Sequence, residues 1–196
     1  MMNANFLLAG VGGQGTLLAS DILADIGLRI GADVKKSEVH GMSQRGGAVT
    51  SHVRWGEHVA SPLCEKGAVD YFVAQEMLEA LRWIEFIRPG GTVLLNQQQI
   101  VPTSTVYGAD QYPGNDHVIS VVKSAAGKVL LIDAKKVAEE LGNPRVANSV
   151  LLGALSAQMD VSTDDWLAVI VSRVPQKHVE INRQAFYAGR ERNWEI

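Results

Sequence analysis

The sequence predicts an α/β fold in which a mostly parallel β-sheet lies between two layers of helices, and three observations support this prediction. Short apolar runs typical of buried strands alternate with segments whose apolar residues recur every three or four positions, as in helices. Glycines mark the first strand-to-helix turn, where such folds bend tightly. The 196 residues, 46% of them hydrophobic, suit one sizeable core, so we expect a single domain over residues 1–196.

The N-terminal half is expected to alternate strands with helices, because the hydrophobic period changes repeatedly between two and about 3.6. In chain order, the elements expected before residue 97 lie at 5–10, 14–30, 32–39, 48–55, 69–76, 77–87 and 92–96. The helix at 77–87 should end at "RPGG", because proline and glycine are helix stop signals.

The strand at 48–55 alternates apolar with polar residues, which predicts that one face is exposed. Thr50 and His52 would lie on that exposed face. The following "WGEH" reads as a turn into a short partner strand around Val59, so we expect a β-hairpin excursion here.

The C-terminal half is expected to be mainly helical. After a segment at 97–115 with little periodicity, which we interpret as an excursion or a loop facing a partner, the expected elements lie at 117–126, 128–133, 134–142, 145–159, 163–174 and 177–189. The strand among them is "KVLLID". Gly142 and Gly189 would each end a helix, and Ser162 or Thr163 would cap the helix at 163–174.

The composition excludes several classes of function. A net charge of −3 and a pI near 5.9 give no overall attraction to nucleic acid or to an anionic membrane. The sequence has no apolar run long enough to predict a membrane helix, and no signal peptide is evident. We therefore expect a cytoplasmic protein. Cys64 is the only cysteine, which excludes an internal disulfide and a four-thiolate metal or iron–sulfur site, and no metal site is expected.

The stretch "GVGGQG" is the first candidate binding loop. Gly10, Gly12 and Gly15 fit the pattern G-x-G-x-x-G between a predicted strand and helix, which makes the predicted fold Rossmann-like. In that pattern Gly10 allows the turn, Gly12 allows backbone to approach a ligand, and Gly15 allows the helix to pack on the strand. Together with Gly13 and Gln14 they would hold an anion at the helix N-terminus. Alternatively, these glycines serve packing alone.

The position twenty residues further on argues against NAD as the ligand. Lys35 and Lys36 lie near the place where an acidic residue would bind the ribose, and Glu38 comes slightly late. Lysines at this position suit a phosphate better than a ribose diol.

The stretch "HGMSQRGGAV" is the second candidate, because it places four hydrogen-bonding side chains between glycines at a strand end. The cofactor-binding candidates here are Ser43, Gln44, Arg45, Gly46 and Gly47. Arg45 could bind a carboxylate or phosphate through two parallel hydrogen bonds, or it could pair with a surface carboxylate in an ordinary turn. His40 and Arg45 are the only candidates for a catalytic role, and no triad or metal-ligand spacing surrounds His40.

The combination of "GVGGQG" with "SEVHGMSQRGG" resembles the gamma-type subunits and domains of 2-oxoacid:ferredoxin oxidoreductases, and more narrowly the small subunits that act on indolepyruvate. The resemblance continues through "SHVRWGE", "EALRWIEFIRPGGTVLLN", "IDAKKVAEELGNPRVANSVLLGAL" and "EINRQAFYAG", and so covers nearly the whole chain. Segment 97–115 departs from it most.

This resemblance implies a division of labour between two chains. A large alpha subunit would hold thiamine diphosphate and the 4Fe-4S clusters, and it would oxidise arylpyruvates to aryl-acetyl-CoA with ferredoxin as electron acceptor. This chain would bind no cofactor alone and would be inactive alone, and its two glycine-rich loops would contact coenzyme A or shape the shared active site. Without its partner it should expose an apolar patch and form a homodimer or larger species.

Three alternatives remain open at this stage. The chain could be the gamma-type subunit of an enzyme for another 2-oxoacid. It could be a free-standing nucleotide-binding protein, against which the lysines at the ribose position argue. It could also be a structural subunit whose glycine loop contributes only to an interface.

Overall fold

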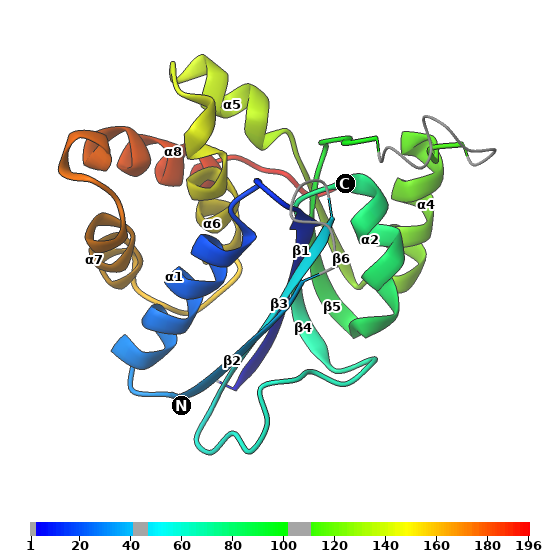
Figure 1. Cartoon of the computed structure of the whole chain (residues 1–196), viewed down its shortest axis with the longest axis horizontal. Helices are drawn as coiled ribbons and strands as arrows, with labels where there is room; N and C mark the ends of the chain where they lie inside the picture. Colours follow the sequence, from blue (N-terminus) through cyan, green and yellow to red (C-terminus); the bar gives the residue numbers. More distant parts are fainter. Residues whose placement is uncertain (1–2, 41–46, 102–110) are drawn as a thin grey trace.

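Six strands form one sheet with the order β2-β3-β1-β4-β5-β6 in the computed structural model, which describes residues 3–40, 47–101 and 111–196 (Figure 1). The strands are β1 (Ala4–Val11), β2 (Asp33–His40), β3 (Ala48–Gly56), β4 (Val69–Ala74), β5 (Ile87–Asn96) and β6 (Lys128–Ile132). Strands β1, β4, β5 and β6 are parallel, whereas β3 runs antiparallel to both β1 and β2. The carboxyl ends of four parallel strands therefore meet at one edge of the sheet.

Helices cover both faces of the sheet, which confirms the predicted fold class (Figure 1). They are α1 (Thr16–Arg29), α2 (Met77–Trp83), α4 (Asn115–Ala125), α5 (Ala134–Glu140), α6 (Ala147–Ser156), α7 (Thr163–Arg173) and α8 (Val179–Glu191). Strand β1 alternates between the two cores: Phe6 and Leu8 pack with α1 and α5–α8, and Leu7 and Ala9 pack on the side of α2 and α4. Among the described residues, no helix is long and apolar enough to cross a membrane.

The predicted hairpin between the strand at 48–55 and a partner around Val59 is wrong, as the pairing of β3 shows. Strand β3 pairs along its length with β1 and β2, so the hairpin is β2–β3, and Val59 lies outside any strand. Thr50 and His52, expected to be exposed, are both buried. The Cys64 amide and the Phe86 ring, both from segments outside the sheet, lie against His52 on this face of β3. The His52 imidazole accepts a hydrogen bond from the amide of Cys64 at 3.2 Å, and burial lowers its pKa.

The predicted "RPGG" stop is also wrong in detail. Helix α2 ends at Trp83, a 3₁₀ turn covers Ile84–Phe86, and "RPGG" already belongs to β5. The pairing of β4 with β5 shifts in register between Val69 and Tyr71, which accommodates this irregular beginning of the strand.

Two predicted helix boundaries are confirmed and one is wrong. Gly142 follows α5 with a φ of 86°, and the Ser162 hydroxyl caps α7 by accepting a hydrogen bond from the Asp165 amide at 3.1 Å. Gly189, however, lies inside α8. A Cβ at that position would lie 1.9 Å from the carbonyl oxygen of Val150 in α6, so glycine is required there for the two helices to pack.

Candidate functional site

A cavity of about 670 Å³ lies at the carboxyl edge of the sheet, beside the loop between β1 and α1. Strands β1 and β4 are neighbours, but their following helices, α1 and α2, cover opposite faces of the sheet. Open α/β sheets bind ligands in the crevice that such a divergence creates. The structure thus brings the first predicted loop, Gly10–Gly15, to the position that this rule predicts.

Carboxamide side chains from four separate parts of the chain meet at this cavity. They form what we call the carboxamide cluster: Gln14, Gln75, Asn96, Gln98 and Asn148. Gln75 and Asn96 are buried, and the cluster contains no charged side chain. Carboxamides both donate and accept hydrogen bonds. Most of these groups bond one another or nearby backbone, and among the described residues Nε2 of Gln98 has no protein acceptor.

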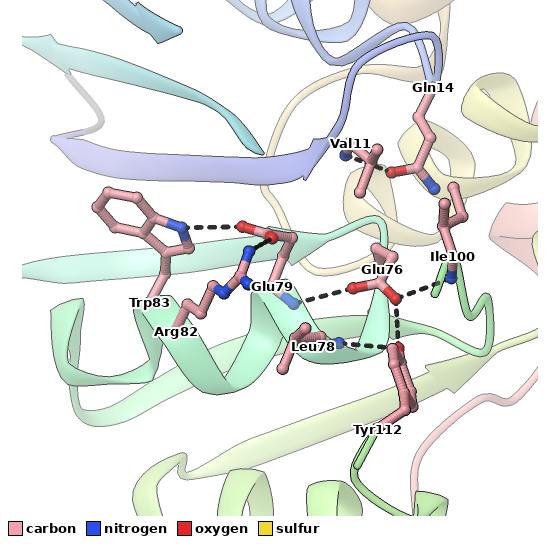
Figure 2. Close-up of polar contacts among 9 residues, drawn as sticks. All are labelled: Val11, Gln14, Glu76, Leu78, Glu79, Arg82, Trp83, Ile100 and Tyr112. Atoms are coloured by element: carbon pink, nitrogen blue, oxygen red, sulfur yellow. Dashed lines mark hydrogen bonds and ion pairs between the residues drawn. The ribbon is translucent and has the colours of Figure 1, made fainter. Parts of the chain in front are cut away.

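Gln14 connects the glycine loop to the rest of the cluster. Its Oε1 accepts a hydrogen bond from the amide of Val11 at 2.6 Å, a contact shown in Figure 2. Its Nε2 donates to the carbonyl oxygen of Gln75 at 2.9 Å and to Oε1 of Gln98 at 3.0 Å. The side chain of Gln14 is therefore fixed by residues that follow β4 and β5.

Gln75 and Asn148 connect the same loop to α6. Oε1 of Gln75 accepts a hydrogen bond from the Thr16 hydroxyl at 2.5 Å, and its Nε2 donates to Oδ1 of Asn148 at 2.6 Å. Nδ2 of Asn148 donates to the carbonyl oxygens of Gln14 at 2.9 Å and Gly15 at 3.2 Å. These contacts hold the start of α1 in a defined position relative to α6.

The glycines of the loop make room for this cluster. A Cβ on Gly10 would lie 2.8 Å from the side-chain oxygens of Gln14 and Gln75, and a Cβ on Gly15 would lie 2.4 Å from Nδ2 of Asn148. Gly15 therefore allows Asn148 to approach, in place of the predicted packing of the helix on the strand. Gly13 has a φ of 101°, and no atom lies within 4 Å of its ideal Cβ position.

The two glycine-rich stretches meet at the backbone of Gly12. Its amide donates a hydrogen bond to the carbonyl oxygen of Gly47 at 2.9 Å. The Gly12 amide is thus already used within the protein. Over the described residues, the amides of Gly13 and Gly15 donate to no protein acceptor, and no side chain caps α1. The first turn of α1 also contains no acidic residue, so this end of the helix favours an anion.

Two cations lie on the wall of the cavity formed by α5 and the turn before α6. Lys135 and Arg145 both line the cavity and are both exposed. Lys135 has Glu139 at 3.8 Å, and among the described residues Arg145 has no carboxylate partner. The Arg145 guanidinium is therefore available to an anionic ligand.

The remaining sequence candidates lie outside the described residues: Ser43, Gln44, Arg45 and Gly46, and the side chain of His40. Sequence reasoning missed Gln75, Asn96, Gln98, Lys135, Arg145 and Asn148. A usable signal existed for the first two, because the two predicted strands at 69–76 and 92–96 end in polar residues, Gln75 and Glu76 in one and Asn96 in the other. Nothing local marks Arg145 or Asn148.

Comparison with known proteins supplies a family. The family model described as pyruvate ferredoxin/flavodoxin oxidoreductase matches residues 5–192. The indolepyruvate oxidoreductase subunit IorB of Thermococcus kodakarensis is 39% identical over 192 residues, which cover 96% of this chain and 95% of the relative.

Two solved structures share the fold. The gamma subunit of a keto/oxoacid ferredoxin oxidoreductase from Geobacter sulfurreducens PCA has a TM-score of 0.70 at 26% identity, covering 96% of each chain. The 2-oxoglutarate:ferredoxin oxidoreductase from Magnetococcus marinus, solved with 2-oxoglutarate, coenzyme A and succinyl-CoA bound, has a TM-score of 0.75 at 22% identity. The match covers 97% of this chain and 31% of the chain from Magnetococcus marinus.

Proposed function

The chain belongs to the pyruvate ferredoxin/flavodoxin oxidoreductase family, and we propose that it is the small subunit of an indolepyruvate:ferredoxin oxidoreductase. The 39% identity to a relative of that name, over nearly the full length of both chains, supports the choice of substrate. The complete enzyme would convert an arylpyruvate and coenzyme A to aryl-acetyl-CoA and carbon dioxide, with ferredoxin as electron acceptor.

We assign the redox cofactors to a large partner subunit, because the residues of this chain do not fit them. An iron–sulfur cluster needs several thiolates, whereas Cys64 is the only cysteine of the chain. Cys64 is also buried, which raises the pKa of its thiol to about 11 and keeps it protonated. Thiamine diphosphate is assigned to the same partner subunit as part of this proposal.

Coenzyme A is the ligand we assign to the cavity, and the observation that carries this proposal is the chemistry of its wall. The phosphates of coenzyme A match the uncapped N-terminus of α1 together with Lys135 and Arg145. The amide groups of its pantetheine arm match Nε2 of Gln98 and the carboxamide oxygens of Gln14 and Gln75, each of which can accept a second hydrogen bond. A structure solved with coenzyme A bound shares the fold of this chain.

The large subunit would cover the rim of the cavity. Leu18 and Val101 are exposed large apolar residues, one lining the cavity and the other next to Ile100, which also lines it. Exposed apolar residues beside a polar site are typical of a surface that a partner covers. The same surface would lead the isolated chain to self-associate.

Coexpression with the large subunit tests this function. The chain alone should be colourless and inactive, and the complex should oxidise indolepyruvate with ferredoxin only when coenzyme A is present. Oxidation of pyruvate or 2-oxoglutarate in preference to indolepyruvate would identify another 2-oxoacid enzyme of the family. Turnover by the lone chain, or tight binding of a free dinucleotide by it, would contradict the subunit assignment.

A further inference from the structure

Glu76 is a buried carboxylate that lies behind the cavity wall, without lining the cavity itself. It stands between β4 and α2, and its Oε2 accepts a hydrogen bond from the amide of Glu79 at 3.0 Å, so it caps α2. Its Oε1 accepts hydrogen bonds from the amide of Ile100 at 3.0 Å and from the hydroxyl of Tyr112 (Figure 2). One side chain therefore contacts the start of a helix and two further residues, Ile100 and Tyr112.

The contacts of the Tyr112 hydroxyl show which partner donates in its hydrogen bond with Glu76. Its hydroxyl oxygen accepts a hydrogen bond from the amide of Leu78 at 3.2 Å, so its single proton is directed to Glu76. All three partners of Glu76 are then donors, which suits an ionised carboxylate, an acceptor only. Burial and the adjacent Glu76 carboxylate raise the pKa of Tyr112, which keeps that proton in place.

The choice of glutamate at this position is informative. Asp, Ser, Thr and Asn cap helices better than Glu, since their shorter side chains reach the amides of the first turn directly. The additional methylene of Glu76 extends the carboxylate to Ile100 and Tyr112 as well. The residue thus suits a role beyond helix capping.

Through these contacts Glu76 holds one wall of the cavity in place. Gln98 and Ile100 line the cavity, and the carbonyl oxygen of Gln98 accepts a hydrogen bond from the amide of Met77, next to Glu76. Oε1 of Gln98 in turn accepts a hydrogen bond from Gln14 of the glycine loop. Ile100 itself lines the cavity two residues after Gln98, so its displacement would change the shape of this wall.

We propose that Glu76 is a positioning residue for the ligand of this cavity, acting through the backbone of Ile100 and the hydroxyl of Tyr112. The inference rests on the proposed function in one respect only, namely that the ligand is coenzyme A. The positioning itself concerns residues of this chain and can be measured without any ligand.

Glu79 provides a matched control. It lies in the first turn of the same helix and is equally buried, but its carboxylate binds only within α2, to the side chains of Arg82 and Trp83 (Figure 2). Burial raises the pKa of Glu79. Shortening Glu79 therefore perturbs a buried carboxylate of α2 without releasing the cavity wall.

The test compares Glu76→Asp with Glu79→Asp in the assembled complex. Asp retains the charge and can still cap α2, but it is one methylene too short to reach Ile100 and Tyr112. Glu76→Asp should raise the KM for coenzyme A about threefold to tenfold, as expected for one or two weakened hydrogen bonds, and leave kcat near wild type. Glu79→Asp should leave this KM unchanged. Equal KM values for the two variants would contradict a role of Glu76 in binding coenzyme A.

Hydrogen exchange in the isolated chain separates the positioning from the identity of the ligand. Glu76→Asp should accelerate exchange of the Ile100 amide, and Glu79→Asp should not. If exchange accelerates while the coenzyme A dependence stays wild type, the wall is positioned but the ligand is wrong. Unchanged exchange contradicts the positioning itself. Should Glu76→Asp fail to fold, Tyr112→Phe removes one of the two wall contacts and serves in its place.

Discussion

In the contact between α6 and α8 the glycines face backbone, whereas in the loop between β1 and α1 they face carboxamide side chains and open space. A Cβ on Gly153 would lie 2.0 Å from the carbonyl oxygen of Phe186, and one on Gly189 would lie 1.9 Å from that of Val150. These oxygens cannot move aside unless a whole helix shifts. Both glycines therefore set the distance between α6 and α8.

The loop glycines differ in the atoms that surround them. Gly10 and Gly15 adjoin the ends of Gln14, Gln75 and Asn148, the side chains that form the cavity wall. Gly13, whose ideal Cβ position is open, lines the cavity. The comparison shows that a glycine's role depends on whether it faces backbone, functional side chains or space for a ligand.

The α6–α8 contact should give the largest effect. Gly189→Ala places a methyl group against the Val150 carbonyl, and we expect a loss of about 4 kcal/mol or more in the free energy of unfolding. For a chain of this size that corresponds to a drop in Tm of at least about 8 °C. Thermal unfolding followed by circular dichroism measures it, and a drop below about 2 °C would show that the helices separate easily.

Gly15→Ala should have an intermediate effect. Its φ of 76° is strained for alanine, and the new methyl group would displace Asn148, together costing about 2–4 kcal/mol. Adding Asn148→Ala removes the displaced side chain. The double variant should therefore lose less free energy of unfolding than the two single variants lose together. Additive losses in urea unfolding would mean that Asn148 does not obstruct the methyl group.

Gly13→Ala should have the smallest effect on folding. Gly31 is a matched control, because it also has a positive φ, of 83°, and no atom within 4 Å of its ideal Cβ position, but it lies outside the cavity lining. Each substitution should cost about 1–2 kcal/mol through backbone strain. Only Gly13→Ala should raise the KM for coenzyme A in the complex. The same KM for both variants would remove the functional distinction between the two regions.

The sequence was informative about the fold because the relevant signals are local. Strand and helix periods, the cap at Ser162 and the stop at Gly142 each depend on a few neighbouring residues. Gly189 was misinterpreted because a glycine after a helical run looks like a stop. Glycine is required at this position because the backbone of Val150, on another helix, lies against it. His52 was misplaced for a similar reason: its alternating pattern does not show that Cys64 and Phe86, from later in the chain, cover this face of β3.

The candidate site was predictable only in part. The pattern from Gly10 to Gly15 located the cavity, because the strand-to-helix turn of such folds lies at the carboxyl edge of the sheet. The sequence could not show that Asn148 reaches the loop from α6, or that Arg145 faces the same space. Those contacts join residues more than 130 positions apart.

The most direct test of the central claim, that this cavity binds coenzyme A in the assembled enzyme, is the coenzyme A dependence of a complex carrying Arg145→Ala. Loss of a charge-assisted hydrogen bond costs roughly 1.5–3 kcal/mol, so the KM for coenzyme A should rise about tenfold or more. The KM for the 2-oxoacid, the content of thiamine diphosphate and the Tm should stay near wild type, because Arg145 is exposed and has no carboxylate partner among the described residues. A wild-type KM for coenzyme A in a complex that assembles normally would contradict the claim.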